Sequence, residues 1–166
     1  MAFVSQARGR LLKEYKQMTV NPPENITAGP ISEDNFFKWQ FSLLGPPGSL
    51  YESGYFSGII DFPRDYPFSP PKLKFTTPIL HPNVYPTGEV CMSILHNQVD
   101  PSGYEKATEQ WTPGSSVATI LVSLLSLLSD PAFDSPANPD AAVMYRNNPT
   151  EYIKVVQQCV RQSLGL

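Results

Sequence analysis

The chain has 166 residues, of which 41% are hydrophobic and 16% are charged, and its formal net charge is −3. This composition is typical of a folded globular protein, and the length suits one domain that spans residues 1–166. A negative net charge argues against a general nucleic-acid binder, and the longest apolar run, residues 117–128, is too short to span a bilayer.

The first segment of the chain has a helical period. Apolar residues recur every three or four positions, and Asn21, Pro22 and Pro23 predict the end of this helix. The apolar positions are Val4, Ala7, Leu11, Tyr15 and Met18. The same segment carries a small basic patch, which is either a solvated helix face or a docking surface. Its charges are Arg8, Arg10, Lys13 and Lys16 against Glu14.

Arg8 and Arg10 also place charge where the apolar part of a signal peptide would continue, so no secretory signal is expected. The two cysteines, Cys91 and Cys159, are therefore expected to be reduced thiols in a cytoplasmic protein, not a disulfide.

Between residues 26 and 76 the apolar period changes to two, which predicts β-strands. Residues 37–43, 56–62 and 73–75 alternate between apolar and polar side chains, and residues 26–31 form a weaker first strand. The connections are short and rich in glycine and proline. This pattern favours a four-stranded antiparallel meander.

Helical periods return in the second half of the chain. Ser116 predicts the N-cap of a central helix, and Asn138-Pro139 and Asn148-Pro149 each predict the start of a further helix. Cys159 falls on the apolar face of the last helix. An N-terminal helix, a four-stranded sheet, an irregular segment around Cys91, a central helix and two C-terminal helices together predict an α+β fold.

Cys91 allows three chemical interpretations. A zinc site needs about four ligands with paired spacings, and Cys91, His81 and His96 lack such pairs. A Cys–His hydrolase is chemically possible, but the local signatures of known thiol proteases are absent. An isolated cysteine is often an inert buried side chain. Residues 84–88 are turn-rich, however, and such segments run over the surface, which favours a reachable thiol.

Several motifs in order carry a resemblance to a known family. His81-Pro82-Asn83, with Cys91 eight residues after the asparagine, resembles the signature of ubiquitin-conjugating enzymes. YPFSPPKLKF at 66–75, WTP at 111–113 and SDPAFDSPAN at 129–138 are similar to further family segments, so the resemblance covers nearly the whole chain. VCMSILH, SPANPDAAVMYR and the C-terminal QSLGL resemble the branch with an acidic insertion after the cysteine, whose members include conjugating enzymes of endoplasmic-reticulum-associated degradation.

This resemblance implies that Cys91 carries ubiquitin as a thioester and passes it to a lysine amine. Asn83 would donate a hydrogen bond to the oxyanion, a role worth about 3–4 kcal/mol in other acyl-transfer sites. Asn83 is alternatively a turn residue that bonds to its own backbone, and both roles are compatible. His81 is expected to be a buried imidazole tied to the backbone. The remaining expected neighbours of the site are Tyr85, Ser93, Asp134, Ser135 and, in the insertion, Asp100.

The resemblance also implies partners. The activating enzyme would dock on Arg8, Lys13 and Lys16. A RING-type ligase would dock on two loops, through Phe68, Thr112, Pro113 and Gly114. Protein substrates receive the ubiquitin, and no cofactor or metal is expected, because ATP is used upstream by the activating enzyme. A partner would recruit the protein to the endoplasmic reticulum.

Two alternatives to this function stay open. One is a catalytically inactive family member that acts as an adaptor, against which the presence of both Cys91 and Asn83 argues. The other is conjugation of a ubiquitin-like protein. The family pattern further predicts a cis peptide bond at Tyr66–Pro67.

Overall fold

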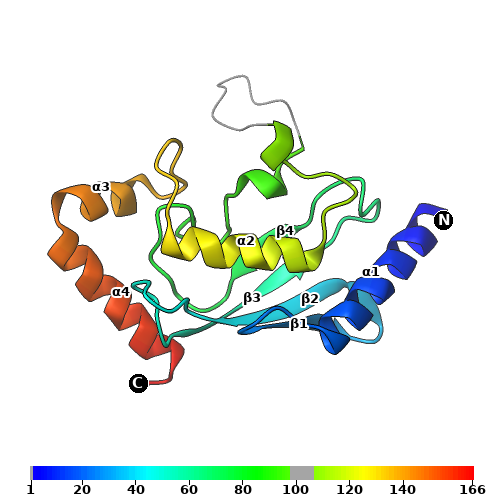
Figure 1. Ribbon diagram of the computed structural model, residues 1–166, viewed down its shortest axis with the longest axis horizontal. Helices are drawn as coiled ribbons and strands as arrows, with labels where there is room; N and C mark the ends of the chain where they lie inside the picture. The colour runs from blue at the N-terminus through cyan, green and yellow to red at the C-terminus, as the bar shows by residue number, and fades with distance from the viewer. Residues whose placement is uncertain (1, 98–106) are drawn as a thin grey trace.

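The computed structural model describes residues 2–97 and 107–166 of the chain. Its helices and strands confirm the predicted α+β order (Figure 1). They are α1 (Ala2–Val20), β1 (Ile26–Ser32), β2 (Asn35–Leu44), β3 (Tyr55–Asp61), β4 (Lys72–Phe75), α2 (Val117–Ser129), α3 (Pro139–Asn147) and α4 (Pro149–Ser163). Two short 3-10 turns, Ser93–Leu95 and Ala107–Glu109, were not predicted. Within the described ranges, no helix combines the length and the apolar character needed to cross a membrane.

The sheet is the predicted antiparallel meander, with strand order β1-β2-β3-β4. Its inner face is apolar because side chains alternate along each strand. Trp39 pairs with Ile60, and Ile60 pairs with Leu73, so that three fully buried side chains form one row across the sheet. Gly58 lies between Phe41 and Phe75, and a Cβ at this glycine would meet the Phe41 ring at 2.5 Å.

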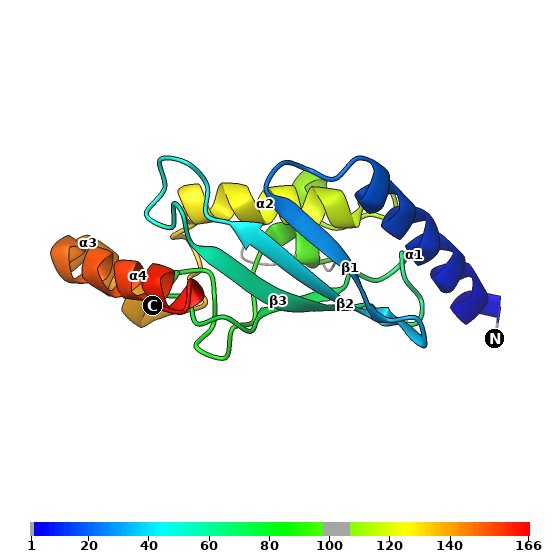
Figure 2. The ribbon, with the colours of Figure 1, turned by 90° about the horizontal axis from the view of Figure 1, so that it is seen from below.

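Helix α2 crosses the inner face of the sheet, whereas α1 lies at one end of the molecule and α3 and α4 at the other (Figures 1 and 2). The predicted cap of α2 is confirmed, since the Ser116 hydroxyl accepts a hydrogen bond from the Thr119 amide at 3.2 Å. Asn138 and Asn148 cap α3 and α4 in the same way, each followed by proline in the first turn. The buried side of α2 consists of Val117, Ile120, Leu121, Leu124 and Leu128.

The inward face of α1 differs in part from the predicted one. Val4 and Tyr15 are each 38% exposed, and Tyr15 packs edge-on against the rings of Phe36 and Trp39 instead of entering the core. Glu14, expected in the surface patch, is only 3% exposed. The buried residues of α1 are Ala7, Leu11, Glu14 and Met18. The exposed charges of α1 are therefore all basic, and they are Arg8, Lys13 and Lys16.

Helix α4 buries Tyr152, Val156 and Cys159, as its apolar face predicts. The Tyr152 hydroxyl hydrogen-bonds to the Tyr51 hydroxyl at 3.0 Å, and Tyr51 in turn donates to the backbone oxygen of Leu80. Burial raises the pKa of the Cys159 thiol. Helix α4 thus supports the chain directly before His81, and Cys159 belongs to that packing.

Candidate active site

The segment that carries Cys91 is attached along strand β4. Isolated bridges join Lys74 to Glu89 and Val84 to Val90, and the Phe75 amide donates to the Gly88 oxygen at 2.8 Å. Gly88 has a φ of 97°, and a Cβ there would lie 2.3 Å from the Phe75 oxygen. Only glycine allows both the left-handed backbone and this close approach. The turn therefore returns the chain to the sheet at a fixed place, directly before Cys91.

His81 is fully buried, and it begins a turn in which the Val84 amide donates to the His81 oxygen. Its Nδ1 accepts a hydrogen bond from the Asn83 amide at 3.0 Å, so its Nε2 carries the proton and donates to the Leu127 oxygen at 2.8 Å. The imidazole thus joins the turn to the last part of α2. Burial lowers the pKa of His81 to about 4, against a smaller opposing effect of the bond to Leu127. The predicted buried, backbone-bonded histidine is confirmed.

The buried histidine gives an expected pH dependence of stability. The folded pKa of about 4 lies below the ordinary value of 6.5, so the unfolded chain binds the proton more readily. The contribution of His81 is complete above pH 6.5 and is lost as the pH falls towards 4, by about 3 kcal/mol in total. Urea unfolding of the parent and of His81→Gln at pH 7, 5.5 and 4.5 measures it. The parent should lose more stability than the variant over this range.

His96→Gln is the matched control, because the chain has two histidines and His96 is only half-buried. This control should retain the parent's loss of stability at low pH. Equal pH profiles for the parent and His81→Gln would show that the buried imidazole is not the titrating group.

Asn83 is 3% exposed and bonds to a segment far away in the sequence. Its side-chain nitrogen Nδ2 donates to the backbone oxygen of Ala132 at 2.7 Å, and its side-chain oxygen Oδ1 accepts from the Ala132 backbone amide at 2.9 Å. The turn interpretation expected a bond to local backbone; the structure shows instead a clamp onto the loop after α2. The Pro82 oxygen strengthens this junction by accepting from the Asn138 amide at 2.9 Å. Two separate loops are therefore held together beside Cys91.

Cys91 is half-buried, and its backbone amide donates to the backbone oxygen of Asn83 at 2.9 Å. The 3-10 turn that begins at Ser93 follows at once and buries Leu95. Cys91 thus lies between two anchored segments, with its backbone tied to Asn83 and part of its surface open to solvent. Cys91 is more exposed than Cys159, which is 8% exposed.

Comparison with known proteins places the chain in a family. A family profile described as "Ubiquitin-conjugating enzyme" matches residues 10–160. The chain is 51% identical to ubiquitin-conjugating enzyme E2 G2 of Bos taurus over 158 residues, 95% of this chain and 96% of that protein. It is 48% identical to ubiquitin-conjugating enzyme E2 15 of Schizosaccharomyces pombe, over 98% of both chains. Ubiquitin-conjugating enzyme E2 13 of Arabidopsis thaliana is also 48% identical, over 96% of both chains.

The chain belongs to the ubiquitin-conjugating enzyme family. It is thereby a member of a family of transferases, and its four helices and antiparallel sheet are the ubiquitin-conjugating fold that the sequence predicts.

The other residues that the sequence assigns to this conjugating site lie at different depths. Tyr85, Asp134 and Ser135 are exposed, and Ser93 is half-buried. Asp100, the expected neighbour in the insertion, lies outside the described residues. Across residues 2–97 and 107–166, no group of three or more potential metal ligands comes together.

The residues assigned to ligase docking lie on two exposed loops. Phe68 is 57% exposed, so it is not a core residue beneath its turn. Thr112, Pro113 and Gly114 are also exposed. The Trp111 indole donates to the Pro67 oxygen at 2.7 Å and joins the two loops. The Tyr66–Pro67 peptide bond is cis, as predicted.

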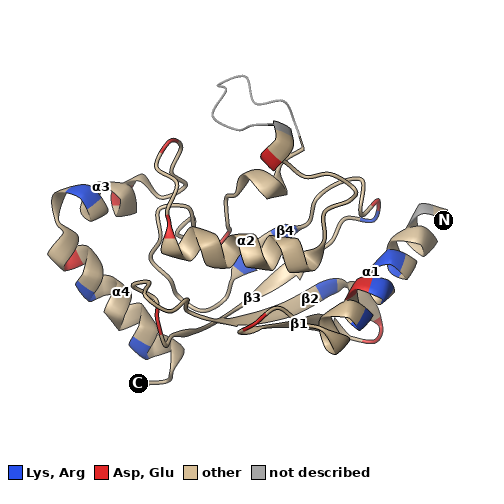
Figure 3. Ribbon diagram, viewed as in Figure 1, with Lys and Arg blue, Asp and Glu red and all other residues tan. Residues whose placement is uncertain are grey.

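The residues assigned to activating-enzyme docking, Arg8, Lys13 and Lys16, lie on α1 and are exposed. Figure 3 shows the Lys and Arg residues of this helix in blue. Arg10 differs from them, because its guanidinium donates to the backbone oxygens of Pro113 and Ser115 in the loop before α2. Sequence reasoning missed this role of Arg10 and the inward position of Glu14. The one available signal is the helical spacing of Glu14 from Ala7, Leu11 and Met18.

Proposed function

We propose that this conjugating enzyme carries ubiquitin on Cys91. The Cys91 thiolate attacks the thioester of the activating enzyme, the activating enzyme's thiol leaves, and a new thioester forms. A lysine amine then attacks this thioester, an isopeptide bond forms, the amine loses a proton, and the Cys91 thiolate leaves. Thiolate is both a strong nucleophile and a good leaving group, so one sulfur serves both steps. The observation that carries the proposal is the half-exposed Cys91 on a doubly anchored turn.

The supporting residues have separate tasks. His81 and the clamp between Asn83 and Ala132 hold the turn in place. An amide nitrogen carries two hydrogens, and the bond to Ala132 uses one of them. The second hydrogen is the donor that we propose for the thioester oxyanion. Tyr85, Asp134 and Ser135 are exposed, and their proposed task is to meet the incoming lysine beside Cys91.

The proposed partners follow from this reaction. The activating enzyme docks on Arg8, Lys13 and Lys16, and consumes the ATP, so the single domain of residues 1–166 uses no cofactor itself. A RING-type ligase docks on the exposed loops of Phe68 and Pro113. We further propose that the enzyme acts in the cytoplasm on proteins destined for degradation, including those at the endoplasmic reticulum, to which a partner recruits it.

A charging assay tests the proposed function. The protein is incubated with activating enzyme, ATP and ubiquitin, and the products are separated on a gel without reductant. A band heavier by one ubiquitin, which disappears with thiol reductant, is the expected result. No such band would indicate an inactive adaptor. A band formed only with a ubiquitin-like protein and its own activating enzyme would identify a different modifier.

Asp100 is expected to affect transfer and not charging. Its carboxylate follows the cysteine closely in sequence and would attract a lysine amine, although it opposes deprotonation of that amine. Asp100→Ala should slow ubiquitin-chain formation by about threefold, the size of an exposed charge interaction. Single-turnover discharge of parent and variant measures this, with Asp34→Ala, an exposed acid at the β1–β2 turn, as control. Indistinguishable rates for the parent and Asp100→Ala would leave Asp100 without a catalytic role, and the same result for a loop-deleted protein would exclude a catalytic role of the insertion.

A further inference from the structure

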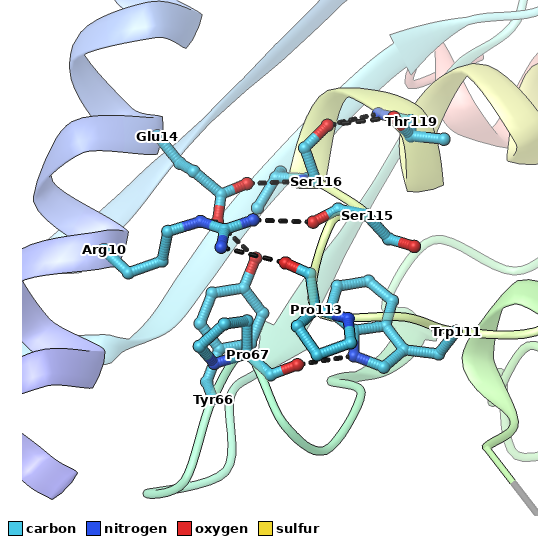
Figure 4. A network of polar contacts seen from close by, with 10 residues as sticks. Arg10, Glu14, Tyr66, Pro67, Trp111, Pro113, Ser115, Ser116 and Thr119 are labelled. Atoms are coloured by element: carbon cyan, nitrogen blue, oxygen red, sulfur yellow. Dashed lines mark hydrogen bonds and ion pairs between the residues drawn. The ribbon is translucent and has the colours of Figure 1, made fainter.

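Glu14 is a buried carboxylate that the conjugation chemistry does not use. It lies on the inward face of α1 and is 3% exposed. Burial of a charged group is costly unless hydrogen bonds and an opposite charge compensate for it. Three donors do so (Figure 4): the Val117 amide at 2.7 Å, the Arg10 guanidinium at 3.1 Å, and the Tyr66 hydroxyl.

Each of these donors leads to one of the two exposed loops. Tyr66 is fully buried and begins the turn that carries Phe68. Burial, together with the Glu14 carboxylate, raises the pKa of the Tyr66 hydroxyl, which therefore stays protonated and donates. Because Phe68 follows Tyr66 by two residues, the hydrogen bond of the Tyr66 hydroxyl fixes the position at which the Phe68 turn begins.

The second loop is held from the same side. Arg10 donates to the Pro113 oxygen at 3.0 Å and to the Ser115 oxygen at 2.7 Å, while Glu14 accepts from Val117 at the start of α2. The Trp111 indole joins the two loops directly by donating to the Pro67 oxygen (Figure 4). Both loops are thus held by hydrogen bonds that lead to one carboxylate, that of Glu14 on α1.

We propose that Glu14 is a positioning residue for ligase docking, because it fixes the spacing between the Phe68 turn and the Thr112–Gly114 loop through Tyr66 and Arg10. The proposal rests on the proposed function, in which these loops receive a RING-type ligase. Glu14 and Tyr66 are too deeply buried to touch a partner, so any effect of theirs on docking acts through the loops.

The test uses Tyr66→Phe, which removes only the hydroxyl, and Glu14→Gln as a second variant. Ser42→Ala is the matched control, since it also removes a buried, hydrogen-bonded hydroxyl, but on strand β2 of the sheet. The probe is an isolated RING domain that stimulates discharge of ubiquitin from the parent protein to free lysine. Each charged protein is titrated with this domain in single-turnover discharge.

For Tyr66→Phe and Glu14→Gln, the half-saturating RING concentration should rise by about fivefold, in line with the loss of one hydrogen bond. Discharge without the RING domain, and both measurements for Ser42→Ala, should match the parent. Tyr66→Phe should add little to Phe68→Ala in a double-mutant cycle, because both act through one loop. A merely structural role would slow discharge with and without the RING domain, and would add to Phe68→Ala.

The indole N–H resonances give an independent readout, because the chain has two tryptophans. The Trp111 resonance should shift in Tyr66→Phe and Glu14→Gln, whereas that of Trp39, which donates to the Phe36 oxygen at 2.9 Å, should stay unchanged. Parent-like RING titrations together with an unmoved Trp111 resonance would overturn the positioning role. A parent that neither charges nor responds to any RING domain would instead overturn the proposed function.

Discussion

Replacement of Cys91 with serine is expected to trap ubiquitin on the protein. The serine hydroxyl can still accept the ubiquitin C-terminus, but the product is an oxyester, and oxygen is a poorer leaving group than sulfur. Discharge to lysine should slow on the order of 100-fold, which corresponds to about 3 kcal/mol of barrier. The measurement is a time course on gels with and without reductant. The parent band is lost with reductant, whereas the Cys91→Ser band persists.

Cys159→Ser is the matched control, since it makes the same chemical change at the other cysteine of the chain. This residue is buried on α4 and should charge and discharge like the parent. A Cys159→Ser protein that does not charge, beside a Cys91→Ser protein whose band is still removed by reductant, would reverse the assignment of the two thiols.

Asn83→Ala is expected to charge normally but to discharge to lysine about 10²–10³-fold more slowly, the usual loss for one oxyanion donor. The effect falls on discharge because the donor is most needed where negative charge develops in the transition state. The substitution also removes both hydrogen bonds to Ala132. Thermal unfolding should therefore show a loss of about 1–3 kcal/mol. Single-turnover rates and unfolding curves on one preparation separate the two effects.

The control for lost stability is Val156→Ala, which opens a cavity in the buried face of α4 and leaves the hydrogen bonds between Asn83 and Ala132 in place. This variant should unfold more easily than the parent, yet discharge at the parent rate. If it slows as much as Asn83→Ala at the same lost stability, the clamp on Ala132 explains the whole effect, and no oxyanion donor is needed.

Local signals were sufficient for most of the fold. The caps at Ser116, Asn138 and Asn148 depend on a side chain and the next turn of the same helix, so short sequences contain them. The alternation in β2 reports directly which side chains face the core. The prediction for α1 was wrong at Val4 and Tyr15, which are exposed, and at Glu14, where a charge was assumed to face water. Two of the three donors to this buried carboxylate, Tyr66 and Val117, are distant in the sequence and leave no local pattern.

The site shows the same division between local and distant information. The depth of His81 and the cis bond before Pro67 followed from motifs that include those residues. The partner of Asn83 did not, since Ala132 is 49 positions further along and bonds through its backbone, which any residue type possesses. Arg10 is similar, because its acceptors are carbonyl oxygens more than 100 positions away. Side-chain identities can be read in a sequence, but backbone acceptors require the fold.

The different depths of the two cysteines also make the molecule convenient for covalent chemistry. Cys159 is packed into α4 and burial raises the pKa of its thiol, so little thiolate is present at neutral pH. Cys91 is partly open to solvent and is the chain's only other cysteine. A thiol-directed fluorophore or electrophilic inhibitor therefore has one target in the native protein, without any engineered cysteine removal. Such a label would report at the same time on occupancy of the candidate active site.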